Sequence, residues 1–322
     1  MTTINTHLTH SRADEYIDYL RSLVAADVRI TSGDDVPSDT YILIEGRPSR
    51  EKLTSCPDLR AVVIPFAGLP VETRQLMADF PQISAHNLHH NAPMTAEMAV
   101  TLLMTAAKNI VPYDREFRKN DWTARYEGNA SIILDGKTAL ILGYGAIGQH
   151  VGAVCRALGM KTIGIRRQAS DDPDVYSPDA LHDLLPRADA LIICLPGTPH
   201  TEGMIGEKEI SLLPKGAIIV NIGRGPIIDG EALYNALKSG HLHGAGSDVW
   251  YNYPTDKESR SDTPPADYPF GELDNMVMSP HRGGGGGAHE VEMRRMKSLS
   301  ELINAATNGH EIPNRIDLEN GY

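Results

Sequence analysis

The sequence predicts an α/β fold with two parallel sheets. Strand and helix patterns alternate over roughly the first ninety residues, and they alternate again, more cleanly, from Thr138 onward. A third observation is the glycine-rich stretch at residues 143–148, which stands between an apolar strand pattern and a helix pattern. We therefore expect a doubly wound parallel sheet of the Rossmann type and a smaller flavodoxin-like α/β sheet.

The first part of the chain carries the patterns of the smaller sheet. Residues 14–25 predict a helix with one apolar face. Short apolar runs predict parallel strands at residues 41–44, 61–64 and 83–85. Residues 72–80 predict the helix between the last two strands.

A long apolar helix pattern follows at residues 95–110. It is too apolar to lie on the surface of a monomer, so we expect it between domains or in a dimer interface. Residues 111–134 are irregular, charged and aromatic, and we interpret them as an arm that reaches another subunit or domain.

The second part begins with an apolar strand pattern that ends at Leu142. Further strands are predicted at residues 161–167, 189–196, 217–223, 245–250 and 276–279. Helices are predicted at residues 147–158, 179–185, 207–212, 230–239 and 289–308. Six strands match the count of a full dinucleotide-binding sheet. The five glycines at residues 283–287 indicate a hinge or a backbone that closely approaches a ligand.

Composition limits the function classes. A chain of 322 residues favours two domains. A net charge of −12 argues against nucleic-acid and membrane-surface partners, because both need basic patches. Three cysteines without C-x-x-C spacing argue against a disulfide framework, and no stretch is apolar enough for a leader or a membrane span. We expect a cytoplasmic protein.

The glycines at residues 143–148 have the spacing G-x-G-x-x-G. Gly143 allows a tight turn, Gly145 lets the backbone approach a pyrophosphate, and Gly148 lets the helix pack on the strand. The helix N-terminus then offers N–H groups to the phosphates. The stretch predicts a nucleotide site, with a merely structural turn as the alternative.

Two arginines follow where the ribose would lie. Arg166 stands eighteen residues after Gly148 at the end of the next predicted strand, with Arg167 beside it. An acidic residue near this position bonds the ribose 2′-hydroxyl, whereas arginine accommodates a 2′-phosphate. The pair favours NADP(H), with NAD(H) possible and two solvated arginines as the alternative interpretation.

Two further polar residues follow predicted strands. Arg224, between two glycines, is suited to recognise a carboxylate, unless it is an ordinary surface arginine. His281 is a candidate general acid–base, unless it is simply a satisfied polar group. We expect no metal site, because carboxylates or cysteines at ligand spacing do not accompany His86, His89 and His90.

Several motifs in order resemble the D-isomer-specific 2-hydroxyacid dehydrogenases, a family that includes formate and phosphite dehydrogenases. GYGAIG with LGMKTIGI resembles the cofactor loop and second strand, and CLPGTPHTEGMI the adenosine and ribose segment. NIGRGPIID, SDVW and SPH are similar to the segments that carry the catalytic arginine, the nicotinamide-side aspartate and the catalytic histidine. IPFAGLP and NAPMTAE resemble the substrate-carboxylate turn and the hinge. The resemblance covers most of the chain and is strongest over residues 95–281.

The resemblance implies hydride exchange with a small 2-oxo or 2-hydroxy acid of D configuration. Arg224 would bind the carboxylate, amides near Ala67 and Gly68 would hold its other oxygen, and His281 would deliver the proton. The implied substrate residues are Ala67, Gly68, Leu69, Asn91 and Arg224. The implied cofactor residues are Gly143, Tyr144, Gly145, Ala146, Ile147, Gly148, Arg166, Arg167, Leu195, Pro196, Thr201, Ile222, Gly223, Asp248, His281 and Gly283.

One position departs from the family. A glutamate usually follows the nicotinamide-side aspartate by five residues, but here Tyr253 follows Asp248. A carboxylate would raise the pKa of His281, whereas a phenol can only orient the ring, so we expect His281 to titrate at lower pH than in glutamate-bearing relatives. Tyr253 is the third catalytic candidate beside Arg224 and His281.

We therefore predict an NAD(P)-dependent 2-hydroxyacid dehydrogenase or 2-oxoacid reductase. The substrate domain would comprise residues 1–93 and 289–322, with the dinucleotide domain inserted at residues 94–288. A homodimer would form through residues 95–134. The alternatives are oxidation of another small anion in the formate-dehydrogenase manner, and a nucleotide-sensing regulator with little turnover.

Overall fold

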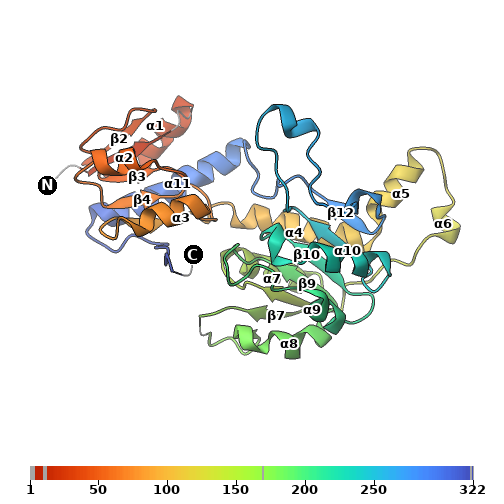
Figure 1. Cartoon of the computed structure of the whole chain (residues 1–322). Helices are drawn as coiled ribbons and strands as arrows, with labels where there is room; N and C mark the ends of the chain where they lie inside the picture. Colours follow the sequence, from red (N-terminus) through yellow and green to blue (C-terminus); the bar gives the residue numbers. More distant parts are fainter. Residues whose placement is uncertain (1–3, 10–12, 169, 320, 322) are drawn as a thin grey trace. The chain divides into compact units, whose positions relative to one another are not determined.

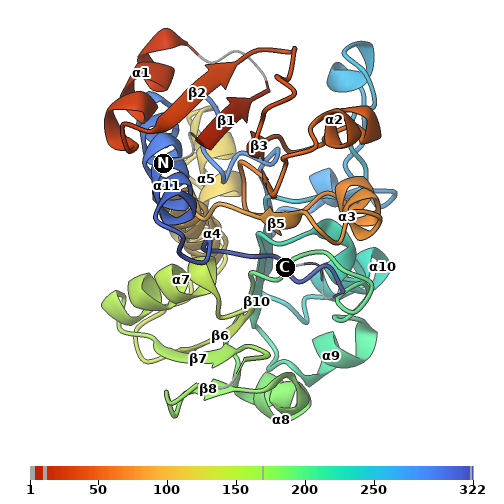
Figure 2. The same cartoon turned by 90° about the vertical axis from the view of Figure 1, so that its left-hand side faces the viewer.

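The computed structural model describes residues 4–9, 13–168, 170–319 and 321. The chain forms two compact units (Figures 1 and 2). The first unit contains the described residues up to Asn91 and those from Gly285 onward, and the second contains residues 92–284.

The first unit is built on a five-stranded parallel sheet in the order β2-β1-β3-β4-β5, which is the flavodoxin-like order. Its strands are β1 Ile4–Leu8, β2 Val28–Ser32, β3 Ile42–Ile44, β4 Ala61–Val63 and β5 Ser84–His86. The apolar patterns do not reveal β1 and β2, because both strands contain polar residues. His7 of β1 is buried, and its ring nitrogens lie 2.8 Å from Thr31 Oγ1 and 2.9 Å from the Gly33 carbonyl. These bonds let a polar strand pass through the core.

Helices cover both faces of this sheet (Figure 2). Helices α1 (Asp14–Leu23) and α11 (His289–Thr307) pack on one face, where Leu20 and Leu299 share a core cluster with strand residues. Helices α2 (Arg50–Ser55) and α3 (Val71–Ala78) pack on the other. After α11 the chain returns to β5, where Arg315 forms an antiparallel bridge with His86.

The second unit is built on a seven-stranded sheet in the order β12-β11-β10-β9-β6-β7-β8, and every pairing is parallel. Its strands are β6 Thr138–Leu142, β7 Lys161–Ile165, β8 Val175–Tyr176, β9 Ala190–Ile193, β10 Ile218–Asn221, β11 Gly244–Ser247 and β12 Met276–Met278. This is the Rossmann order with one further edge strand, so the predicted fold class is confirmed. The predicted count of six strands was wrong, because two-residue β8 has no apolar run to identify it.

Helix α4 (Ala92–Ala107) packs on the sheet of its own unit, together with α7 (Ala146–Ala157). The buried residues of α4 therefore belong to the core of its own unit, whereas a dimer interface through residues 95–134 stays a prediction. The approach is close: a Cβ at Gly246 of β11 would lie 2.7 Å from Leu102 Cβ. The opposite face is covered by α8 Leu181–Leu184, α9 Glu207–Leu212 and α10 Gly230–Lys238.

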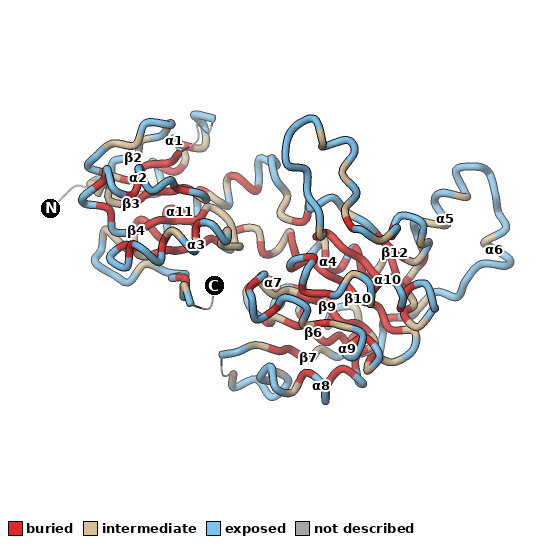
Figure 3. Tube along the Cα trace, viewed as in Figure 1, coloured by how far each residue is buried: buried red, intermediate tan, exposed pale blue. Residues whose placement is uncertain are grey.

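The predicted arm contains two short helices, α5 (Ile110–Phe117) and α6 (Ala124–Glu127), which project from this unit and are largely exposed (Figures 1 and 3). Short 3₁₀ turns occur at η1 Pro178–Ala180, η2 Leu185–Arg187, η3 Gly225–Ile227, η4 Glu258–Ser261 and η5 Phe270–Glu272. Among the described residues, no helix has the length and apolar character needed to cross a membrane.

Candidate active site

The predicted site residues of the second unit follow strands that end together. Register pairs Ile165 with Leu142, Leu142 with Ile193, and Ile193 with Asn221. It continues from Asn221 to Ser247 and then to Met278. The glycine loop, Arg166, Leu195, Arg224, Asp248 and His281 all come after these ends. One edge of the sheet therefore carries them, as expected for a ligand site in this fold.

The glycine loop forms an open cradle at the start of α7. Gly143 has a φ of +99°, and a Cβ on it would lie 2.8 Å from the Cys194 carbonyl carbon. A Cβ on Gly148 would lie 2.3 Å from the Gly143 oxygen, whereas one on Gly145 would meet no protein atom within 4 Å. Gly145 is the N-cap of α7, and Ala146 and Ile147 begin the helix. Close packing at Gly143 and Gly148, with open space at Gly145, fits the binding of an NAD(P) pyrophosphate.

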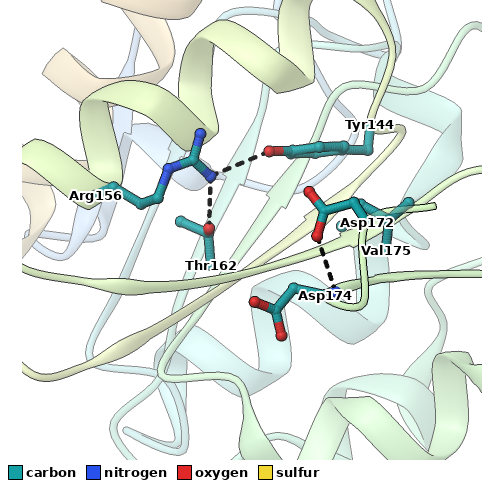
Figure 4. Close-up of a pocket in the computed structure, with 7 residues that line it drawn as sticks. Tyr144, Arg156, Thr162, Asp172, Asp174 and Val175 are labelled. Carbon is teal, nitrogen blue, oxygen red and sulfur yellow. Dashed lines mark hydrogen bonds between the residues drawn. The ribbon is translucent and has the colours of Figure 1, made fainter. Parts of the chain in front are cut away.

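The Tyr144 side chain packs between α7 and β7. A Cβ on Gly164 would lie 2.5 Å from Tyr144 Cγ, so the ring needs this glycine. Arg156 Nη1 donates to Tyr144 Oη (3.1 Å) and Thr162 Oγ1 (2.8 Å) beside a pocket of about 200 Å³ (Figure 4). The other residues that line this pocket are Gly164, Asp172, Asp174 and Val175. The Tyr144 side chain therefore connects the glycine loop to α7 and β7.

The predicted ribose arginines lie next to this loop. The N–H groups of Gly143 and Tyr144 both donate to the Ile165 carbonyl at the end of β7, at 3.0 and 2.8 Å. Arg166 comes directly after Ile165, is half-buried, and donates from Nε to the Gln168 carbonyl (2.9 Å). Arg167 is exposed.

The loops after β9 and β10 touch through their backbones. A Cβ on Gly223, next to Ile222, would lie 2.4 Å from the Leu195 oxygen. Thr201 Oγ1 donates to the Pro196 carbonyl (2.8 Å) and accepts from the Thr198 N–H (2.9 Å), so this predicted cofactor residue shapes its own loop.

Arg224 projects from the turn after β10. Its Nη1 donates to the Gly223 carbonyl (2.7 Å), and a Cβ on Gly197 would lie 2.8 Å from Arg224 Cγ. Asn221 shapes the turn by donating from Nδ2 to the Arg224 carbonyl (2.9 Å) and accepting the Gly223 N–H (3.0 Å). Asn221 and Gly197 were not among the predicted site residues. The local signal was a buried strand ending in an amide side chain.

Asp248 holds the loop that carries His281. Its buried carboxylate accepts from Ser279 Oγ (2.5 Å), the Arg282 N–H (2.8 Å) and the Gly283 N–H (2.7 Å). Between these donors, His281 has a φ of 57°, which is left-handed and uncommon for a non-glycine residue. This role of the Asp248 carboxylate was not predicted from the sequence.

His281 and Tyr253 are in contact, as their proposed roles require. Tyr253 Oη lies 3.0 Å from His281 Nδ1 and accepts the Trp250 N–H at 3.1 Å. Burial and the Arg224 charge lower the pKa of His281, while Asp248 opposes this shift. Burial raises the pKa of Tyr253, although the Trp250 N–H and Arg224 act in the opposite direction. Neutral imidazole is therefore favoured at neutral pH.

The other predicted substrate residues belong to the first unit, not to the edge described above. Ala67, Gly68 and Leu69 follow β4 and are half-buried, and Asn87 Nδ2 donates to the Ala67 carbonyl (2.8 Å). Asn91 is the last residue before α4. His86 contacts the Pro313 carbonyl and Ser84 Oγ, and no group of residues suited to a metal ion occurs in the described part of the chain.

Comparison with known proteins identifies the family. Residues 100–283 match the model of the D-isomer specific 2-hydroxyacid dehydrogenase NAD binding domain, so the chain belongs to this family. It is 34% identical over 230 residues to D-3-phosphoglycerate dehydrogenase of Methanocaldococcus jannaschii, covering 70% of this chain but only 41% of that protein. It is 30% identical to glyoxylate reductase of Aeropyrum pernix, covering 87% of this chain and 82% of that protein.

A solved structure agrees over almost the whole chain. The D-isomer specific 2-hydroxyacid dehydrogenase of Xanthobacter autotrophicus Py2, in complex with NADPH and MES, superposes with a TM-score of 0.78. The match covers 98% of this chain and 99% of that chain at 22% identity. This likeness establishes the fold.

Proposed function

We propose that this protein is an NAD(P)-dependent oxidoreductase acting on a 2-oxo or 2-hydroxy acid. One observation carries the proposal: Arg224, His281 and the open glycine loop follow strands that end in register at one sheet edge. Family membership and relatives named glyoxylate reductase and D-3-phosphoglycerate dehydrogenase support it.

The chain's own residues fit the two ends of such a substrate. Arg224 carries a planar cation with several donors, which suits a carboxylate and polarises the adjacent carbonyl. His281 exchanges a proton with the substrate oxygen at Nε2, because Nδ1 is occupied by Tyr253. A bound nicotinamide supplies or accepts the hydride. The amides near Ala67 and Gly68 and the D configuration stay predictions.

The test is a spectrophotometric screen of glyoxylate, pyruvate, hydroxypyruvate and bulkier 2-oxo acids with NADPH and NADH. We expect turnover with at least one acid and a loss of about 10²–10⁴-fold in His281→Ala. Arg224→Lys keeps the charge but loses the paired donors, so KM should rise. Formate and phosphite with the oxidised cofactors test the alternative reaction. Tight cofactor binding without turnover on any substrate would overturn the proposal and favour a sensor.

We further propose a preference for NADP(H), supported by the position of Arg166 beside the glycine loop. Arg166→Asp should weaken NADPH binding about tenfold or more and affect NADH much less, because an acidic residue suits an unphosphorylated ribose. Lys161→Asp, at the opposite end of the same strand, is the charge-matched control. Equal weakening of both cofactors in Arg166→Asp would contradict the preference.

We also propose a homodimer through the arm. Five large apolar side chains of this segment are exposed, namely Val111, Phe117, Trp122, Tyr126 and Ile133, and Ile110 directly before it is exposed as well. Exposed apolar groups gathered on one segment indicate an interaction surface. Sedimentation should give a dimer that Phe117→Glu weakens and that Val71→Glu, an exposed position of the first unit, leaves intact. A monomer at micromolar concentration would contradict this proposal. The cytoplasmic location likewise stays a prediction.

A further inference from the structure

Tyr253 can do what a carboxylate at its position cannot. A carboxylate accepts hydrogen bonds only, whereas a phenol both accepts and donates. Oη already accepts the Trp250 N–H at 3.1 Å, which leaves its own proton available for His281 Nδ1 at 3.0 Å. With Nδ1 accepting, a neutral His281 carries its proton on Nε2, the nitrogen that faces away from Tyr253.

A neutral imidazole in this tautomer has a chemical difficulty. It can give its Nε2 proton to a substrate oxygen only if a second proton reaches Nδ1, since imidazolate would otherwise form. The charges that shift the pKa of His281 are those of Arg224 after β10 and Asp248 after β11, and neither group supplies that proton: Arg224 stays cationic, and the Asp248 carboxylate accepts three hydrogen bonds. Tyr253 is in contact and holds a proton.

We propose that Tyr253 passes its hydroxyl proton to Nδ1 of His281 as Nε2 gives its proton to the substrate oxygen. This inference rests on the proposed function. The N–H bond at Nδ1 and the O–H bond on the substrate form, while the phenolic O–H and the Nε2–H bonds break. The electron pair of the phenolic O–H bond stays on Oη as phenolate.

The surroundings of Oη suit that phenolate. The Trp250 N–H donates to it, and Arg224 provides a nearby positive charge. Tyr253 is 44% exposed, so water can return the proton to Oη after each turnover, and no other co-reactant is needed. In the oxidation direction the same protons move the opposite way.

The pH dependence of ketoacid reduction tests the relay. In the wild type, kcat should stay nearly level from the pKa of His281 up to the pKa of Tyr253, which burial raises above the ordinary range of a phenol. In Tyr253→Phe, only protonated His281 can act as the acid, so kcat should fall about tenfold per pH unit above the His281 pKa, which burial lowers from that of an ordinary histidine. Tyr253→Glu should move the start of that fall to higher pH, because a carboxylate raises the pKa of His281.

The shape of the profile separates a relay from mere orientation. A Tyr253→Phe profile parallel to the wild type, whether lower or equal, would overturn the relay. Solvent isotope mixtures give a second kinetic criterion: two protons should be in flight in the wild type and one in Tyr253→Phe. His281→Ala addresses the proposed function separately, because its inactivity would support His281 as the acid even if the relay failed.

A measurement without turnover completes the test. Nitrogen-15 spectra of the cofactor-free protein, with His281→Gln identifying the resonances, report which ring nitrogen carries the proton. At pH 8 we expect His281 of the wild type to be protonated at Nε2, and Tyr253→Glu to be protonated at Nδ1. Protonation of the wild type at Nδ1 would overturn the inference.

Discussion

The loops after β6 and β12 leave the same sheet edge, but they are held in different ways. The loop after β6 is held by glycines that leave no room for a Cβ, such as Gly148 against the Gly143 oxygen. The loop after β12 is held by side chains from β11 and beyond, chiefly the Asp248 carboxylate and the Tyr253 phenol. Backbone packing shapes the proposed cofactor cradle, whereas hydrogen bonds shape the proposed proton site.

This difference has a functional meaning. A cradle made of backbone presents N–H groups that need no protonation state and hardly depend on pH. The His281 loop depends on ionisable groups, so its conformation and its chemistry respond together when one of them changes. Substitutions in the loop after β6 should therefore change mainly stability and cofactor affinity. Substitutions in the loop after β12 should change kcat and its pH dependence.

The largest expected effect is that of Gly148→Ala. Its Cβ would stand 2.3 Å from the Gly143 oxygen, so the loop must shift, at about 1–3 kcal/mol in free energy of unfolding and about 100-fold or more in cofactor affinity. Gly145→Ala is the matched control, because its Cβ meets no protein atom within 4 Å. It should weaken cofactor binding while leaving stability nearly unchanged. Equal destabilisation in denaturant titrations of the two variants would contradict this account of the cradle.

Asp248→Asn should come next. It replaces one accepting oxygen by an N–H₂ group and leaves donors of the His281 loop unsatisfied, at about 1–3 kcal/mol, which corresponds to roughly 5–150-fold in kcat. Because the Asp248 charge raises the pKa of His281, its removal should lower that pKa further in an NMR titration. Asp274→Asn, exposed just before β12, should change neither value. An unchanged His281 pKa in Asp248→Asn would contradict the inference that the Asp248 charge raises the pKa of His281.

Gly283→Ala tests the same contact from the other side. Its Cβ would stand 2.7 Å from Asp248 Oδ2 and 3.2 Å from Met98 Cβ, so we expect about a tenfold loss in kcat as the loop moves from the carboxylate. Gly286→Ala, with nothing within 4 Å of its Cβ, should behave like the wild type. Similar losses in both variants would mean that loop flexibility, and not the Asp248 contact, is what matters.

Tyr144→Phe should have the smallest effect. It removes the hydroxyl that accepts from Arg156 and keeps the ring over Gly164, so stability should fall by about 1 kcal/mol. Cofactor affinity should change by less than about threefold, because the phenol lies behind the loop. A large loss of affinity with unchanged stability would show that the hydroxyl has another role.

The same contrast explains how much could be predicted from sequence. The glycine cradle, the parallel strands and the fold class depend on neighbours within a few residues, so local patterns reveal them. The Asp248 contacts join residues 31 to 35 positions apart, and the bond between Tyr253 and His281 spans 28. Such bonds leave no local pattern, and only the family resemblance pointed to position 253.

The fold showed a similar limit. Strand β1 was missed because His7 is buried through bonds to distant residues, and β8 because two residues cannot form a recognisable run. Helix α4 was recognised as apolar, but its partner was not, since hydrophobicity alone does not identify the surface that a helix covers. The glycine-containing strand β11 beneath it was the available signal.

The packing of α11 onto the first unit has a consequence during synthesis. The second unit is one continuous segment and can fold as soon as it leaves the ribosome, whereas the core around Leu20 lacks Leu299 and Ile303 until α11 is made. Roughly 200 residues separate Asn91 from α11, which at about 5–20 residues per second corresponds to roughly 10–40 s. During that time α11 does not yet cover one face of the first sheet. The apolar residues of that face are exposed in the nascent chain, where chaperones can bind and aggregation can begin.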